Sequence, residues 1–186
     1  MTKHYGSGSE MNQKILSGVN ILADNVASTL GPRGRNVILQ EKGKRPIITK
    51  DGVTVANFVD IEDPIGNAAV QIIKQAAAQT NIDAGDGTTT STVLSRAILN
   101  RAQKYISAGV PPVEVQRGIE KAVEAIVNNL EGIARPIKSE EDIAHVASIS
   151  ANNDNTIGNL IAKAVSAAGK DGAITVEEAK SHKTSL

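Results

Sequence analysis

The sequence contains no cysteine and no tryptophan, and it has only 1 Phe and 2 Tyr among its 186 residues. Without cysteine there are no disulfides, thiolate metal ligands or cysteine nucleophiles, which fits a reducing compartment. With so few aromatic rings, a base-stacking surface is excluded, and the core must be built from Ala, Ile, Leu and Val. Aliphatic side chains of this kind favour closely packed helices.

Net charge and long apolar runs are lacking as well. The 20 Lys and Arg balance the 20 Asp and Glu, so no long-range field attracts nucleic acid or an anionic membrane. No apolar run approaches the ~18 residues of a membrane span, and the first residues lack the apolar stretch of a signal peptide. We therefore expect a soluble, cytoplasmic protein that binds neither nucleic acid nor membrane.

Four segments with apolar residues at spacings of three and four predict four long helices. The first covers about 10–28 and ends before Gly31. The second begins at Asp63, a capping carboxylate that is followed by a proline suited to the first helical position. The third covers about 88–107 and the fourth follows Pro112. We expect these four helices to form a bundle-like core.

Between the first two helices lie two apolar, β-branched runs, 36–40 and 46–50, separated by a charged segment that contains glycine. This pattern predicts a β-hairpin. Because a two-stranded hairpin is marginal alone in water, it is expected to join a larger sheet, supplied by this fold or by another chain.

After residue 133, where we expect a domain boundary, the segments become shorter and more polar. Ser139 and Asp142 resemble a capping box that opens a short helix ending near residue 150. A further helix is predicted over 155–168 and a strand over 173–177, so the second part reads as a small α/β segment.

The most informative stretch is 84–92, where two glycines flank Asp86 and a run of threonines opens the third predicted helix. A helix start needs only one capping residue. Two glycines let the backbone approach a ligand, while helix-start amides and threonine hydroxyls suit phosphate oxygens. Asp86 can hold Mg²⁺, which bridges the β- and γ-phosphates of a nucleotide. The stretch predicts a nucleotide or phosphate site.

Two other segments have both an ordinary and a functional interpretation. Residues 29–36 form a glycine stop to a helix, or a loop that lies against a nucleotide while its carbonyls coordinate a cation. Residues 48–53 form an Asp-Gly turn, or they place Asp51 to orient water for attack on a γ-phosphate.

Other nucleotide and metal motifs are absent. The sequence has no G-x-x-x-x-G-K-[ST] and no G-x-G-x-x-G, which gives no support to a P-loop or a Rossmann site. Its histidines, His4, His145 and His182, are far apart in the sequence, so a metal-hydrolase site has little support.

Four motifs, in their order and spacing, resemble the group I chaperonins, the GroEL type; they are residues 29–37, 48–53, 84–90 and 149–152. The Gly-Arg-Asn-Val and Thr-Lys-Asp-Gly-Val forms resemble the bacterial and organellar group rather than the archaeal and eukaryotic-cytosolic one. The resemblance extends from about residue 9 to about residue 178.

The resemblance implies a mainly α fold, with an equatorial ATP-binding domain over 1–133 and a first, truncated segment of the intermediate hinge domain over 134–186. The apical domain, through which the family binds unfolded client proteins and the co-chaperonin, is expected to be absent. The hairpin at 36–50 and the termini are expected to contact neighbouring subunits of a homo-oligomeric ring.

The resemblance also implies a site for ATP, Mg²⁺ and K⁺. Asp86 would bind Mg²⁺, Asp51 would take part in hydrolysis, and the carbonyls of Thr29 and Lys50 would lie near K⁺. The residues expected to contact the nucleotide are Thr29, Leu30, Gly31, Pro32, Lys50, Gly87, Thr88, Thr89, Thr90, Ile149 and Ser150.

Three hypotheses for function follow. The first is an ATP-hydrolysing chaperonin segment in which nucleotide shifts the intermediate domain about its hinge and so assists protein folding. The second is a catalytically incomplete chaperonin-like fragment that acts as an oligomerisation or interaction module. The third, less supported, is an unrelated helical enzyme that binds phosphate.

Overall fold

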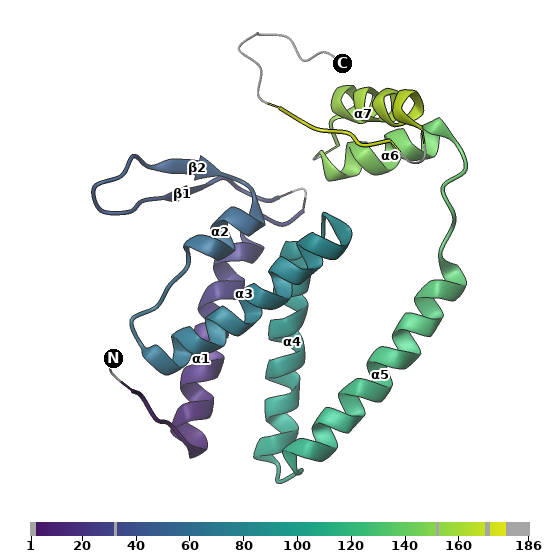
Figure 1. The fold of residues 1–186 in the computed structure, drawn as a ribbon. Helices are drawn as coiled ribbons and strands as arrows, with labels where there is room; N and C mark the ends of the chain where they lie inside the picture. Colours follow the sequence, from purple (N-terminus) through teal and green to yellow (C-terminus); the bar gives the residue numbers. More distant parts are fainter. Residues whose placement is uncertain (1–2, 32, 152, 170–171, 178–186) are drawn as a thin grey trace. The chain divides into compact units, whose positions relative to one another are not determined.

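The computed structural model describes residues 3–31, 33–151, 153–169 and 172–177. These ranges form seven helices and two strands, which confirms the expected mainly helical fold (Figure 1). In chain order the elements are α1 (Gly8–Ala27), β1 (Val37–Leu39), β2 (Ile47–Thr49), α2 (Gly52–Phe58), α3 (Pro64–Ala84), α4 (Thr88–Ser107), α5 (Pro112–Ile133), α6 (Glu140–Ser150) and α7 (Asn155–Ala168). Among these helices none is long and apolar enough to cross a membrane, within the part of the chain described.

The chain divides into two compact units, residues 1–121 and 122–186. The division falls inside α5, and the domain boundary expected near 133, at the end of that helix, stays a prediction.

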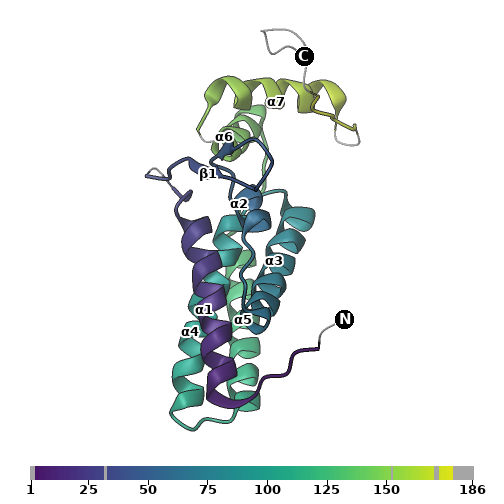
Figure 2. The same cartoon turned by 90° about the vertical axis from the view of Figure 1, so that its left-hand side faces the viewer.

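In the first unit, α1, α3 and α4 pack on one another and α2 packs across them (Figure 2). The core cluster consists of Leu22, Val26, Val55, Ala56 and Val70, none of them more than 3% exposed. Full burial of a Val or Leu side chain contributes about 1.5–3 kcal/mol to the free energy of unfolding. The cluster contains only aliphatic side chains, so burial of this kind stabilises it. It lies where α2 meets α1 and α3.

Local capping explains where α3 begins and ends. The Asp63 carboxylate accepts a hydrogen bond from the Gly66 amide at 2.7 Å, and Pro64 takes the first helical position, as the sequence predicts. Gly85, with φ of 70°, ends the helix in the left-handed region that favours glycine.

Helix α2 was not predicted from the sequence, which reads there as an Asp-Gly turn after the hairpin. Consecutive β-branched residues, Val53 to Val55, are poor helix formers. The helix forms because the Asp51 side chain caps it and because Val55 and Ala56 are buried in the core. Tertiary burial therefore outweighs local propensity in this segment.

The hairpin is formed as predicted, with Ile38 opposite Ile48 in an antiparallel pair. In the described residues these two strands make a sheet of their own, so the expected larger sheet is not supplied by this part of the chain. Ile38 and Ile48 are 70% and 67% exposed. A partner from another chain stays a prediction.

Two expectations about the remaining elements are wrong. α5 was expected in the helical core, but none of its residues is buried. An amphipathic stripe shows which face a helix can bury without showing what covers that face. The strand expected over 173–177 is also missing, since residues 172–177 have no regular structure. A strand requires a hydrogen-bonded neighbour, and the described residues provide none there.

In the second unit, α6 and α7 pack together. The capping box predicted at the start of α6 is present, because Ser139 accepts from the Asp142 amide while the Asp142 carboxylate accepts from the Ser139 amide. Gly158 of α7 lies against Ser148 of α6, so the two helices approach closely at a small residue.

The crossing of α1 and α3 gives a stability prediction. A side-chain carbon added at Gly18 would lie 2.5 Å from the carbonyl oxygen of Gly66. We expect Gly18→Ala to destabilise the first unit by about 1–3 kcal/mol, because the helix backbones must separate. Gly118→Ala is the matched control, since no atom lies within 4 Å of the added carbon. It should stabilise its helix by up to about 1 kcal/mol. Urea unfolding midpoints measure both changes, and an unchanged midpoint for Gly18→Ala would contradict the close crossing.

Candidate functional site

The loop between α3 and α4 has a fixed shape in front of a helix N-terminus. Gly85 and Gly87 have φ of 70° and 87°, a region in which a side chain is strained. The Asp86 carboxylate accepts a hydrogen bond from the Gly87 amide at 2.6 Å. Gly87 is the N-cap of α4 and has no side-chain oxygen to occupy the first amides. A loop of this form suits an anion.

The three threonines at the start of α4 differ in exposure. Thr88 is buried, Thr89 is half-buried and Thr90 is exposed. Thr92, one turn further on, is buried and donates its hydroxyl to the Thr88 carbonyl at 3.0 Å. Because residues four apart lie on one face of a helix, Thr88 and Thr92 belong to the packed side of α4, and Thr90 faces solvent.

Asp51 is held at the start of α2 by three hydrogen bonds. Its Oδ2 accepts from the Thr54 amide at 2.9 Å and from the Thr54 hydroxyl at 2.6 Å, while Oδ1 accepts from the Val53 amide at 3.3 Å. Partial burial raises the pKa of the Asp51 carboxyl, but these hydrogen bonds outweigh the burial and leave that pKa below its usual value. The carboxylate is therefore ionised at neutral pH.

Gly52 brings two of the sequence motifs together beside the end of α1. A side-chain carbon added there would overlap the Thr89 hydroxyl and would lie 3.5 Å from Cγ1 of Val26. The start of α2, the start of α4 and the end of α1 therefore converge on one glycine. Thr29 continues this region from α1, since its hydroxyl donates to the Val26 carbonyl at 2.8 Å.

The loop that follows α1 folds back on the end of that helix. Thr29 is buried, and its carbonyl lies against Gly34. The Arg35 amide donates to the Ser28 carbonyl at 2.9 Å, and Gly31 has φ of 75°. The remaining predicted residues differ in environment: Leu30 is 47% exposed, Lys50 is half-buried just before Asp51, and Pro32 lies outside the described residues.

Ile149 and Ser150 lie at the end of α6, in the second unit. Ile149 is 69% exposed. Just beyond the helix Asn153 adopts φ of 64° and donates its amide to the Ser148 carbonyl at 2.7 Å, which ends α6. A contact of Ile149 and Ser150 with the nucleotide stays a prediction.

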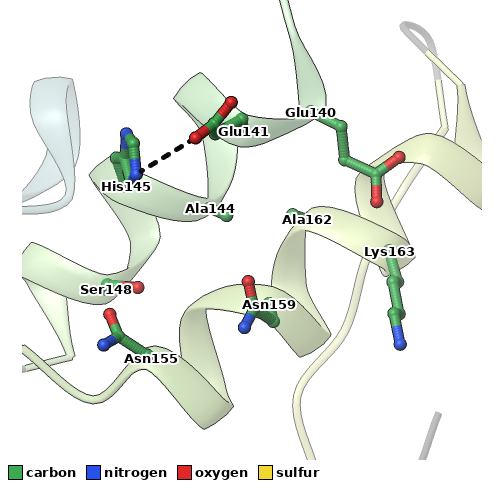
Figure 3. A pocket seen from close by; sticks show the side chains of 9 residues that line it. All are labelled: Glu140, Glu141, Ala144, His145, Ser148, Asn155, Asn159, Ala162 and Lys163. Atoms are coloured by element: carbon green, nitrogen blue, oxygen red, sulfur yellow. Dashed lines mark ion pairs between the residues drawn. The ribbon is translucent and has the colours of Figure 1, made fainter.

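The second unit also has a groove of about 620 Å³ between α6 and α7. Figure 3 shows Glu141 and His145 on α6, whose nearest N and O atoms are 3.9 Å apart and form an ion pair when the imidazole is protonated, and Asn155 and Asn159 on α7. Across the described parts of the chain, no three His, Cys, Asp or Glu side chains are grouped to hold a metal ion. The groove is lined mainly by polar side chains.

Sequence reasoning missed Gly52 and Thr54 as site residues. The signal that could have found Thr54 is Asp51 itself, a favoured N-cap residue, which places Thr54 in the first turn of a helix. The contact between Gly52 and Thr89 joins residues far apart in the sequence, and no local pattern predicts it.

A known protein family and a solved structure are similar to this chain. The TCP-1/cpn60 chaperonin family matches residues 22–185. The crystal structure of a group III chaperonin in the open state is similar, with a TM-score of 0.73 and 26% sequence identity. The match covers 85% of this chain and 32% of that one, so the chain spans about a third of that relative's length.

The expected assignment to the group I, GroEL-type chaperonins is wrong at the level of the subgroup. The family that matches is the broader TCP-1/cpn60 family, and the similar structure is of group III. The motifs behind the assignment are glycine loops and helix starts, whose chemistry suits a phosphate. Their order and spacing indicate the family without discriminating among its groups.

The capping box of α6 gives a pH prediction. Hydrogen bonds from the Lys138 amide and from Ser139 hold the pKa of Asp142 below its usual value. The stabilisation is therefore complete above about pH 4, the ordinary value of an unfolded Asp, and is lost as the pH falls through the lower folded value. We expect the Lys138 and Ser139 amide resonances to shift in acid with a midpoint below that ordinary value. In Asp142→Asn this acid-dependent shift should be absent; a midpoint at the ordinary value in the native chain would contradict the capping role.

Proposed function

We propose that this chain, which belongs to the TCP-1/cpn60 chaperonin family, binds and hydrolyses ATP as part of a chaperonin that assists protein folding. The observation that carries the proposal is the approach of Gly52 to the Thr89 hydroxyl. It brings the start of α2, with Asp51, beside the start of α4, where the amides suit a phosphate. A hydrolytic site needs this combination of an anion site and a fixed carboxylate.

The phosphates would bind to Gly87, Thr88, Thr89 and Thr90 at the start of α4. Asp86 would hold Mg²⁺, since carboxylate oxygens are ligands that this ion prefers. Bound Mg²⁺ would neutralise negative charge on the phosphates. Among these groups Thr90 and Asp86 are exposed, and Thr88 would contribute through its backbone amide.

The rest of the nucleotide would lie against Thr29, Leu30, Gly31 and Pro32, with the exposed Leu30 side chain available as an apolar surface. The carbonyls of Thr29 and Lys50 would coordinate K⁺, because carbonyl oxygens can replace the hydration shell of that ion.

Ile149 and Ser150 would reach the nucleotide from the second unit. Their contact would couple nucleotide occupancy to movement of that unit about a hinge.

Asp51 would orient the attacking water. The carboxylate can do so because its lowered pKa keeps it ionised as an acceptor and because three hydrogen bonds hold it in place.

The hairpin would contact neighbouring subunits of a homo-oligomeric ring, since its exposed Ile38 and Ile48 and its unpaired edges suit a partner strand. Clients and a co-chaperonin would bind through other parts of a chaperonin.

A second candidate function, an interaction module without catalysis, is favoured by α5. Its apolar residues Val123, Ile126 and Leu130 are 48%, 58% and 54% exposed. Exposed apolar stripes of this kind mark surfaces that associate.

Separate variants test the two carboxylates. Asp86→Ala should remove the Mg²⁺-dependent part of ATP affinity, measured by calorimetry with and without Mg²⁺. Asp51→Ala should leave the Kd unchanged and lower phosphate release by about 10²–10⁴-fold. Asp83→Ala is the control, because it removes a nearby exposed carboxylate that the site does not use. Unchanged turnover in Asp51→Ala would reject the catalytic role of Asp51. Binding of ATP by the native chain without turnover would favour the interaction module.

The convergence at Gly52 has its own test. Gly52→Ala must displace either the Thr89 hydroxyl or the start of α2. A displacement of about 1 Å at a catalytic group costs about 10²-fold in rate, so turnover of Mg-ATP should fall by that order. Gly118→Ala should have no effect, since its added carbon meets nothing. Equal turnover in Gly52→Ala and the native chain would show that this contact does not position the site.

A further inference from the structure

We propose that Thr54 is a positioning residue, whose hydroxyl fixes the Asp51 carboxylate in a single orientation through a 2.6 Å hydrogen bond to Oδ2. The inference deepens the proposed function, and rests on it, because the orientation matters for hydrolysis only if Asp51 acts on water there. The geometry that supports it is independent of any nucleotide.

The two oxygens of the Asp51 carboxylate are held unequally. Oδ2 accepts two hydrogen bonds from one residue, the amide of Thr54 at 2.9 Å and its hydroxyl at 2.6 Å. Oδ1 accepts a single, longer bond from the Val53 amide at 3.3 Å. A carboxylate oxygen has two lone pairs, so Oδ2 is filled while Oδ1 can accept another hydrogen bond. Thr54 therefore engages one oxygen of the carboxylate and leaves the other available to water.

The hydroxyl does more than a helix cap requires. An N-cap carboxylate needs only the backbone amides of the first turn. A hydroxyl that donates to a charged oxygen forms a short and strong hydrogen bond. Because Thr is β-branched, its χ1 angle is restricted in a helix mainly to two rotamers, so the hydroxyl has few directions available.

Helix α2 supplies a rigid base for Thr54. The next residue, Val55, is 2% exposed in the core. At the other end of the helix, Lys74 of α3 donates to the Asn57 carbonyl at 3.1 Å and to the Asp60 carboxylate at 3.2 Å. The helix is therefore fixed at its start by Gly52 against Thr89 and at its end by Lys74, so Thr54 has little freedom to move.

The test compares Thr54→Val, which removes the hydroxyl and keeps the branched shape, with Thr54→Ser, which keeps the hydroxyl. The χ1 populations of Asp51 are measured by NMR from three-bond couplings of its carboxyl carbon to the backbone nitrogen and carbonyl carbon. We expect one rotamer in the native chain and in Thr54→Ser, and an averaged mixture in Thr54→Val. Thr54→Ala replaces the valine variant if the latter fails to fold.

Turnover supplies the second measurement. Phosphate release from Mg-ATP should fall by about tenfold or more in Thr54→Val, the loss of one hydrogen bond to a charged group, with the Kd unchanged. Thr54→Ser should restore it. A single Asp51 rotamer in Thr54→Val overturns the proposal, whatever the turnover. An averaged rotamer together with native turnover supports the positioning of Asp51 by Thr54 and instead contradicts the catalytic role of Asp51, so the two failures are distinct.

Discussion

The close approach of the backbone at Gly52 to the Thr89 hydroxyl holds distant parts of the chain in one place. The end of β2 and the start of α2 are separated in sequence from the start of α4 by the whole of α3. They meet because Val55 and Ala56 of α2 are buried with Leu22, Val26 and Val70. Burial of a few aliphatic side chains thus sets the distance between a carboxylate and a helix N-terminus, and residue 52 must be small for that distance to be possible.

The long helices could be predicted because each carries its own local signals. Asp63 with Pro64 starts α3, Gly85 ends it, and the Ser139–Asp142 pair opens α6, all within a few residues of the position concerned. α2 could not be predicted from local sequence, since its β-branched residues favour an extended chain. The helix forms because its buried residues pack in the core. The strand expected over 173–177 fails for the opposite reason, because its local pattern is favourable and no neighbour pairs with it in the described residues.

The residues of the candidate site also differ in whether the local sequence predicts them. Asp86 and the threonines that follow could be found from composition and spacing, because phosphate chemistry needs those residue types next to one another. Gly52 and Thr54 act through contacts made in three dimensions and carry only a weak signal in sequence. The subgroup of the family could not be read from these motifs either, since the chemistry that fixes them is common to every member that binds a phosphate in this way.

The exposed Leu30 has a practical consequence for experiments on this molecule. The sequence contains no tryptophan, and the two tyrosines, Tyr5 and Tyr105, are 89% and 56% exposed. Intrinsic fluorescence is therefore dim and insensitive to changes in the interior. An indole introduced at position 30 would be the single bright emitter in the chain, and it would stand on the loop where a ligand is proposed to lie. Occupancy could then be followed by light emission from one defined point.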